Sequence, residues 1–307
     1  MSILSRLSHA LTLLVLMLIL SFGNKLAAND SIYSLRLNQI QVKATHNSYH
    51  LRPSIWPLSQ WNYSMPTLRV QLGDYHVRSL ELDIHISHDQ EEIEVYHIYG
   101  IDSNSHCKKF IQCLLDIRTF SQKNPRHSPV FVWIEIKDQS GGRPFDHFEL
   151  LESNIQEYLG DRLVTPNQLR AGEKSLKAAI LQKNWPTVGE LAGKIIFILH
   201  TTKNHQARTY TYNFTSLHNR LMFAKATHAQ RHMPWALFTH VAADKPETIA
   251  RSKKEGLLVM TSGCLAKLSD DECLSRRALA LKSGANFIKE DYPGPNKRGI
   301  PWLELMH

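Results

Sequence analysis

The sequence predicts an α/β fold, a single-domain TIM-barrel-like (β/α)8 barrel of regular or irregular form. Short apolar stretches alternate with amphipathic stretches along the chain, which is typical of parallel strands covered by helices. The 307 residues are 43% hydrophobic, enough for one large core, and no linker rich in proline, glycine and serine divides them. In such a barrel the functional side chains belong at the carboxyl ends of the strands.

The first half of the chain opens with a strand in which Ile40, Val42 and Ala44 alternate with other residues. The loop-like segment 51–63 follows, and its aromatic rings either insert into a lipid interface or pack against the barrel end. Apolar periodicity and terminators such as Pro125 define the next elements. They are a helix over 66–74, strands over 79–86 and 92–97, a helix over 108–123, a strand over 130–137 and a helix over 145–159.

In the second half, two capping boxes mark helix starts. Thr187 with Glu190 predicts a short helix, and Ser269 with Glu272 predicts a helix that ends at Gly284. A further helix is expected over 246–255, and strands are expected over 194–200, 221–226, 236–241, 257–260 and 285–291. The total of about eight strands favours closure into a barrel.

The N-terminal segment is separate from this domain. Arg6 precedes a short apolar run over 11–20, and small residues end at Ala28. The run is too short to span a bilayer comfortably and fits an export signal, with a retained N-terminal anchor as the alternative. We therefore expect a signal peptide over 1–28, a catalytic domain over 29–307, and a secreted or periplasmic protein.

The net charge is basic and indicates an anionic partner. Removal of the signal takes away Arg6 and Lys25 and no acidic residue, so the formal charge of +8 becomes +6. The chain has no block of lysine and arginine interleaved with aromatic residues, which disfavours nucleic acid. An anionic phospholipid at a membrane surface is the better candidate, and we expect a monomer in peripheral contact with it.

The four cysteines form two local pairs, Cys107 with Cys113 and Cys264 with Cys273. Export permits disulfides, whereas neither spacing resembles a zinc knuckle. Disulfides and free, half-buried thiols are equally compatible with the sequence.

Polar residues interrupt the first two strands at places where a site can form. His46 and Asn47 follow the alternating run of the first strand. Period-2 geometry places Glu81 and Asp83 on one face of the second strand, so their carboxylates converge.

A third strand adds a carboxylate and an ammonium group. Glu135 and Lys137 share a face with Trp133, on the side that is expected to be buried. Burial of these charges costs several kcal/mol unless they are paired or bind a metal. Lys137 is a candidate salt-bridge partner of Glu135, two residues away on the same face.

The side chains of this constellation are suited to a hard divalent cation. The oxygen donors prefer calcium, which tolerates irregular geometry, and one bound ion is expected. These donors are Asn47, Glu81, Asp83 and Glu135. His46 and His97 remain as groups that titrate near neutral pH, and two histidines beside a cation suit phosphoryl transfer.

The order of these motifs resembles the catalytic X-region barrel of phosphoinositide-specific phospholipase C, and more narrowly the secreted, calcium-dependent bacterial type. The matching features are His46-Asn47, Glu81-Leu-Asp83, His97 and Glu135 on successive segments. The sequence segments 43–50, 185–197 and 284–293 also resemble that type, so the likeness spans most of the chain.

The resemblance implies that phosphatidylinositol is cleaved to diacylglycerol and a cyclic inositol phosphate by attack of the inositol 2-hydroxyl. His97 would protonate the leaving group, His46 would stabilise the pentacoordinate phosphate, and Glu81 or Glu135 would act as the base. By the same resemblance Lys137 would contact the phosphate or the headgroup, instead of serving only as the salt-bridge partner of Glu135. The second half of the chain shows no complete headgroup-reading set, so phosphatidylinositol is less firmly implied than the reaction class.

Two other functions are compatible with parts of the pattern. A glycerophosphodiester phosphodiesterase has a similar barrel, a similar pair of acidic residues and two histidines. Its first strand normally carries His-Arg, however, where this chain has His46-Asn47. A non-catalytic secreted barrel that binds lipid headgroups would gain nothing from burying three carboxylates. The bacterial phospholipases that use an arginine in place of calcium are disfavoured, because the acidic set would repel itself without a cation.

Overall fold

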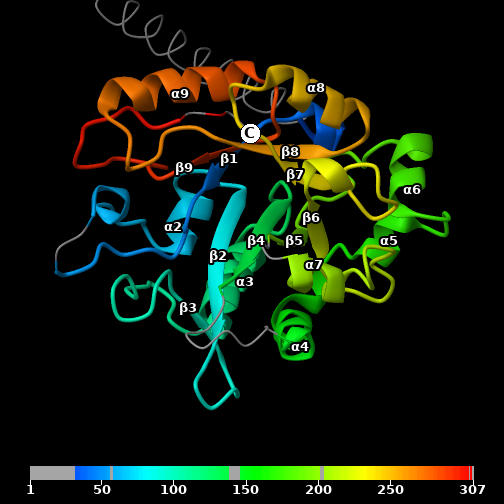
Figure 1. Cartoon of the computed structure of the whole chain (residues 1–307), viewed down its shortest axis with the longest axis horizontal. Coiled ribbons are helices and arrows are strands. Elements are labelled where there is room, and N and C mark those ends of the chain that lie inside the picture. Colours follow the sequence, from blue (N-terminus) through cyan, green and yellow to red (C-terminus); the bar gives the residue numbers. More distant parts are fainter. Residues whose placement is uncertain (1–31, 56–57, 138–145, 201–203, 304, 306–307) are drawn as a thin grey trace, which may run out of the picture.

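The protein is described here by a computed structural model that covers residues 32–55, 58–137, 146–200, 204–303 and 305. Eight parallel strands close into a barrel, because β1 pairs with both β9 and β2 (Figure 1). The barrel strands are β1 (Val42–Thr45), β2 (Ser79–Ile86), β4 (Val130–Ile136), β5 (Ile195–Leu199), β6 (Phe223–Ala226), β7 (Phe238–His240), β8 (Leu258–Ser262) and β9 (Phe287–Glu290). The predicted single-domain α/β barrel is confirmed.

One predicted strand lies outside the barrel. β3 (Ile93–Val95) pairs antiparallel with β2 and extends the sheet. The Ser87 amide donates to the Glu92 carbonyl at 2.8 Å and closes a hairpin, and a connection of this length cannot carry a parallel crossover. His97 therefore follows a hairpin strand that is attached to β2, not a barrel strand.

Helices surround the strands (Figure 1). They are α2 (Leu68–Gly73), α3 (Phe110–Lys123), α4 (Phe148–Leu159), α5 (Pro166–Arg170), α6 (Leu176–Lys183), α7 (Asn204–Tyr210), α8 (Pro246–Lys254) and α9 (Asp270–Lys282). The helices α5, α6 and α7 were not expected from the sequence. The buried residues of α6 are nearly consecutive, which leaves little helical periodicity to detect.

The short helix predicted at Thr187 is wrong. The Glu190 amide donates to Thr187 Oγ1 at 3.1 Å, as in a capping box, but the chain continues as turns. The Val188 amide donates to the Leu35 carbonyl at 2.8 Å, and the Gly189 amide donates to the Tyr33 carbonyl at 2.9 Å. These tertiary hydrogen bonds take the place of helical ones. The capping box at Ser269 does start α9, as predicted.

An aromatic layer fills the barrel beneath its carboxyl end. Trp133 packs edge-on against Phe238 and Phe287, with ring centroids 5.9 and 5.6 Å apart. Phe223 packs on Phe238 at 5.3 Å. Because side chains two residues apart on a strand share a face, each of these aromatics places the next inward residue at the barrel mouth.

Both cysteine pairs are disulfides, Cys107–Cys113 and Cys264–Cys273, which settles the alternative that the sequence left open. Among the described residues, none of the helices combines the length and apolar character that a membrane crossing requires. The predicted signal peptide over 1–28 lies outside the described residues.

The buried His127, between α3 and β4, generates a prediction about stability. Its Nδ1 donates to the Ser128 carbonyl at 2.8 Å, its Nε2 lies 2.7 Å from Ser121 Oγ, and burial lowers its pKa to about 4. The unfolded chain therefore binds more protons than the folded chain between about pH 6.5 and about pH 4, and stability falls as the pH falls.

When the pH falls from about 7 to about 5, the free energy of unfolding should decrease by less in His127→Gln than in the wild type. The two decreases should differ by up to about 2 kcal/mol. Urea unfolding at both pH values measures the difference. The exposed His218 provides the matched control, and His218→Gln should retain the full pH dependence. Equal pH dependence of stability in the wild type and in His127→Gln would contradict the lowered pKa of His127.

Candidate active site

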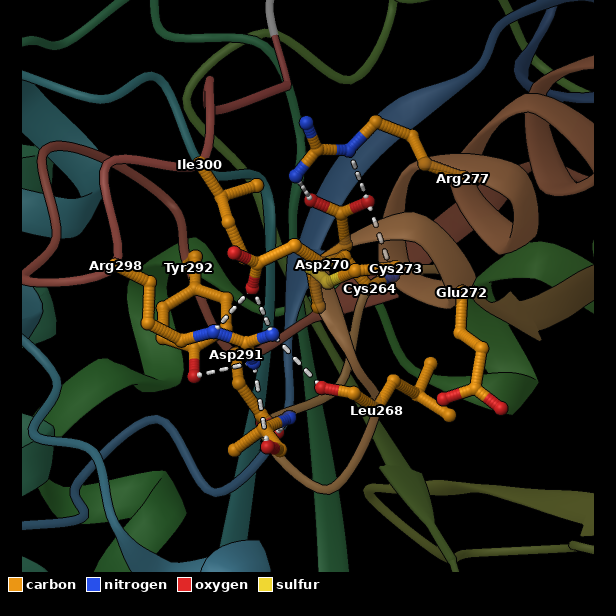
Figure 2. Close-up of a disulfide and its surroundings, with 12 residues drawn as sticks. Cys264, Leu268, Asp270, Glu272, Cys273, Arg277, Asp291, Tyr292, Arg298 and Ile300 are labelled. Carbon is orange, nitrogen blue, oxygen red and sulfur yellow. Dashed lines mark hydrogen bonds and ion pairs between the residues drawn. A yellow bond between two sulfur atoms is a disulfide. The ribbon is translucent and has the colours of Figure 1, made fainter.

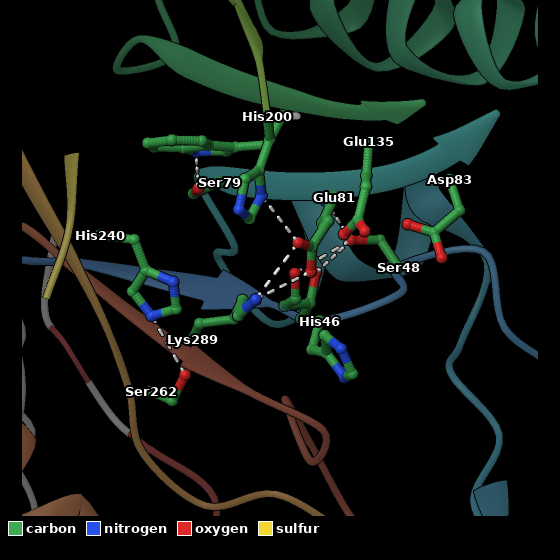
Figure 3. Close-up of polar contacts among 12 residues, drawn as sticks. His46, Ser48, Ser79, Glu81, Asp83, Glu135, His200, His240, Ser262 and Lys289 are labelled. Atoms are coloured by element: carbon green, nitrogen blue, oxygen red, sulfur yellow. Dashed lines mark hydrogen bonds and ion pairs between the residues drawn. The ribbon is translucent and has the colours of Figure 1, made fainter. Parts of the chain in front are cut away.

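Polar side chains from successive strands meet at the carboxyl end of the barrel (Figure 3). Each lies two residues beyond an inward apolar residue of its own strand: Glu135 after Trp133, Lys289 after Phe287, and His240 after Phe238. His46 and His200 lie just past the ends of β1 and β5. Strand periodicity and the closed barrel therefore build the site together.

Glu81 lies at the centre of this group and is fully buried. Lys289 Nζ lies 3.2 Å from both of its carboxylate oxygens, and His200 Nδ1 lies 3.1 Å from Oε1 (Figure 3). Burial alone would raise the pKa of Glu81, but Lys289 and then His200 hold it well below its usual value. Glu81 is therefore an anion in the folded protein.

Asp83 and Glu135 are direct partners in the register of β2 and β4. Lys137 Nζ bridges them, 3.0 Å from Asp83 Oδ2 and 2.9 Å from Glu135 Oε1. Burial raises the pKa of Asp83 to about 6, with Lys137 opposing the rise and Glu135 adding to it. Neither Asp83 oxygen has a well-aligned hydrogen bond in the part of the chain that is described.

Asn47 occupies the turn between β1 and the loop that follows. Its φ of 44° is left-handed, a conformation that asparagine tolerates better than most residues, and it is buried. The turn is tied to β2: the Ser48 amide donates to the Glu81 carbonyl at 2.9 Å, and the Glu81 amide donates to Ser48 Oγ at 2.8 Å. Asn47 is thereby held next to the acidic strand.

The acidic group fits a divalent cation. Glu81, Glu135 and His200 each offer a ligand atom, and these atoms lie within 4.8 Å of one another. Two of the three belong to the predicted set, and His200 is an addition that the sequence did not suggest. Asp83, with its poorly satisfied buried carboxylate, is a further oxygen donor on the strand that carries Glu81.

His46 is paired with Asp291, the residue that follows β9. The two side chains lie 2.9 Å apart, from His46 Nδ1 to Asp291 Oδ1. A carboxylate only accepts hydrogen bonds, so Nδ1 carries the proton. Burial would lower the pKa of His46, but Asp291 more than offsets this and the pKa is raised. The pair favours the imidazolium form.

His97 is paired with Asp102, which also binds a second histidine. Asp102 Oδ2 accepts from His97 Nδ1 at 2.8 Å, and Oδ1 pairs with Nε2 of the fully buried His50 at 2.9 Å. Burial would raise the pKa of Asp102, but hydrogen bonds from His50 and His97 hold it below its usual value. Trp61 lies edge-on to the His97 ring at 5.9 Å.

Nitrogen-bearing side chains line the part of the barrel mouth away from β2 and β4. Burial lowers the pKa of His240 to about 3, with Lys289 and His200 acting in the same direction. Burial also lowers the pKa of Lys225, on β6. The mouth thus presents an acidic side on β2 and β4 and a nitrogen-rich side on β5, β6, β7 and β9.

Of the predicted residues, the structure brings together His46, Glu81, Asp83, Glu135 and Lys137, and it keeps Asn47 on the adjoining turn. His97 follows the hairpin strand β3, which pairs with β2, the strand that carries Glu81 and Asp83. Sequence reasoning missed four residues. They are His200, Lys289, Asp291 and Asp102. His200 and Asp291 end predicted strands and Lys289 lies near the end of one, which was a usable signal, whereas Asp102 lies in a loop.

Comparison with solved structures identifies the same fold in two bacterial enzymes. A calcium-dependent phosphoinositol-specific phospholipase C from a Gram-negative Pseudomonas species is 18% identical, with a TM-score of 0.64 over 87% of this chain and 94% of that one. The calcium-dependent phosphatidylinositol-specific phospholipase C from Streptomyces antibioticus is 19% identical, with a TM-score of 0.62 over 85% and 96%. A search of curated protein sequences gave no match.

At these identities the structural matches establish the fold alone, and the sequence establishes the family. The family model described as phosphoinositide phospholipase C, Ca²⁺-dependent, matches residues 86–302, which is more than half of the chain. The chain therefore belongs to the calcium-dependent phosphoinositide phospholipase C family.

Proposed function

We propose that the protein cleaves phosphatidylinositol at a membrane surface into diacylglycerol and a cyclic inositol phosphate, with His46 and His97 as the catalytic pair and one calcium ion. One observation carries the proposal above all. Two histidines each have Nδ1 held by a buried aspartate, and they follow strands that pair with β2, the strand of Glu81 and Asp83.

The proposed calcium ligands are oxygen donors of β2, β4 and the β1 turn: Asn47, Glu81, Asp83 and Glu135. Calcium prefers oxygen, so we assign His200 to orienting Glu81, from which it lies 3.1 Å. When bound, calcium supplies positive charge that acidifies a hydroxyl and neutralises phosphate. The acidic cluster and its poorly satisfied Asp83 carboxylate support this assignment.

The protons in the proposed reaction move between atoms that the site can supply. The inositol 2-hydroxyl oxygen attacks phosphorus, a carboxylate takes its proton, and the bond from phosphorus to the diacylglycerol oxygen breaks. Glu81 is a weak base because its pKa is held low, so we assign the base to Glu135. His97 protonates the leaving oxygen through Nε2, because Nδ1 is engaged by Asp102.

His46 has a different role. Asp291 raises its pKa, so the ring carries positive charge more readily and can stabilise the pentacoordinate phosphate. Lys137 forms salt bridges with Asp83 and Glu135, and the sequence had suggested the one with Glu135. We propose that the Lys137 ammonium group also contacts the phosphate or headgroup.

A set of exposed apolar side chains, here called the apolar rim, supports contact with a membrane. Ile55 is 73% exposed on the loop after β1, and Tyr99 and Ile101 are 74% and 64% exposed on the loop that carries His97. Interfacial aromatic and aliphatic side chains partition into lipid headgroups. Of the aromatics predicted to contact lipid or to pack, Tyr63 packs inside, and Trp56 lies outside the described residues.

Export and monomeric state remain proposals. The basic charge suits an anionic lipid surface, and the N-terminal pattern of residues 1–28 supports export of the domain over 29–307. The final location would be the medium or the periplasm, with peripheral membrane contact.

Calcium binding predicts a rise in thermal stability. At about one hundred times the dissociation constant, calcium should stabilise the native state by about 2.7 kcal/mol and raise the melting temperature by several degrees. Glu81→Gln should reduce this rise, whereas Glu157→Gln, at an exposed position of α4, should not. No rise in the wild type would contradict the calcium site, and an equal rise in Glu81→Gln would remove Glu81 from it.

The assignment of His97 predicts a separation of binding from turnover. His97→Ala should keep the calcium-dependent rise in melting temperature but lower kcat on phosphatidylinositol roughly 10²- to 10⁴-fold. His88→Ala, in the exposed turn between β2 and β3, is the control and should retain wild-type kcat. Near-normal kcat in His97→Ala would overturn its role.

The apolar rim predicts a selective loss of membrane binding. The double variant Tyr99→Ala, Ile101→Ala should bind phosphatidylinositol-containing vesicles at least about tenfold more weakly, because it removes apolar surface from the contact. Leu274→Ala, Leu279→Ala removes two side chains of α9 that are each 44% exposed and should leave binding unchanged. Vesicle sedimentation measures both, and equal binding by the two double variants would contradict the rim.

A further inference from the structure

Each of the two histidines of the site is held by an aspartate, and a disulfide lies near each aspartate. Asp291 contacts the loop that Cys264–Cys273 closes, and Asp102 precedes Cys107 in the segment between β3 and α3. Cys264–Cys273 joins the loop after β8 to α9, and Cys107–Cys113 joins the loop after β3 to α3.

The first loop cradles Asp291 (Figure 2). The Asp291 amide donates to the Cys264 carbonyl at 3.0 Å, and the Ala266 amide donates to Asp291 Oδ2 at 2.6 Å. The other oxygen, Oδ1, is the one that holds His46. The position of the carboxylate therefore depends on a loop that begins at one cysteine of the disulfide.

A buried ion pair reinforces this loop. Arg277, one turn after Cys273 on α9, binds Glu290 through two hydrogen bonds of 2.7 and 2.8 Å (Figure 2). The Cys264 amide donates to Glu290 Oε1 at 3.2 Å, and the Glu290 carbonyl accepts from the His46 amide at 3.0 Å. Both the ring and the backbone of His46 are thus tied to the segment that the disulfide fixes.

The second loop carries both His97 and Asp102. Asp102 and Ile98 exchange backbone hydrogen bonds of 2.9 Å, and His50 forms an isolated bridge with Ser105. The disulfide at Cys107 fixes the end of this loop to the first turn of α3. The described residues 96–109 belong to no regular strand or helix, although the Val95 amide of β3 donates to the Lys108 carbonyl at 2.8 Å. The disulfide adds a covalent restraint at the same end of the segment.

We propose that the two disulfides are positioning crosslinks, each for one histidine: Cys264–Cys273 holds His46 through Asp291, and Cys107–Cys113 holds His97 through Asp102. The inference rests on the proposed function, in which these histidines catalyse the reaction. The crosslinked residues are only six and nine positions apart, and closure of short loops contributes least to stability through chain entropy. In contrast, displacement of a catalytic group by about 1 Å can cost about 10²-fold in rate.

The test compares two double variants of the mature chain, Cys264→Ser, Cys273→Ser and Cys107→Ser, Cys113→Ser. Each removes a whole disulfide and leaves no unpaired thiol from it. Measurements are made at a temperature at which circular dichroism shows both variants to be folded. Nitrogen NMR of the histidine side chains reports the Nδ1 proton that each aspartate holds, and kinetics on phosphatidylinositol micelles report kcat and KM.

We expect each variant to lose or broaden the Nδ1 proton signal of its own histidine and to retain that of the other. We also expect kcat to fall about 10- to 100-fold with KM changed less than about twofold. Asp102→Asn and Asp291→Asn assign the signals, because each should abolish one of them. Retention of both signals with unchanged kcat would overturn the proposal, as would loss of both signals in a folded variant.

The NMR result does not depend on activity. If the signals respond as expected but His97→Ala retains normal turnover, the proposed function fails while the positioning relation stands. If His97→Ala is inactive and the signals do not respond, the positioning relation fails while the proposed function stands.

Discussion

The site depends on three carboxylates on two adjacent strands, of which Glu81 and Asp83 are buried and Glu135 is half-buried. The register of β2 with β4 places Asp83 beside Glu135, and Glu81 lies one inward position below. Such a cluster repels itself unless cations neutralise it, and two lysines do so in this structure: Lys289 on Glu81, and Lys137 between the other two acids. The same geometry that makes the cluster costly also makes it a site for a divalent cation.

The histidines extend this electrostatic arrangement toward the substrate. In both cases a buried carboxylate engages Nδ1, which fixes the ring and leaves Nε2 as the nitrogen that can exchange a proton. The environments nevertheless differ. His46 lies on the barrel rim against Asp291, which raises its pKa, whereas Asp102 divides its two oxygens between His97 and the buried His50. In the proposed reaction these environments suit His46 to carrying positive charge and His97 to donating a proton.

Much of the fold and the acidic part of the site could be predicted from the sequence, because both follow from local periodicity. Alternation placed Glu81 and Asp83 on one face and Glu135 above Trp133, and a closed barrel brings such residues together. The errors have tertiary causes. At Thr187, hydrogen bonds to the carbonyls of Tyr33 and Leu35 take the place of the expected helix. Asp102 pairs with His50 from a loop, where the sequence has no periodicity to indicate the contact. The pairing of Lys289 with Glu81 joins residues 208 positions apart.

The central claim is that a calcium site and two histidines together cleave a phosphoinositide. Phosphorus NMR of phosphatidylinositol micelles tests it most directly, with the chain lacking residues 1–28, first with calcium and then with a chelator. The account predicts a cyclic inositol phosphate signal that appears with calcium and stops growing when the chelator is added. A cyclic product that forms equally well with chelator would contradict the calcium site, and turnover of glycerophosphodiesters but not of phosphatidylinositol would contradict the reaction.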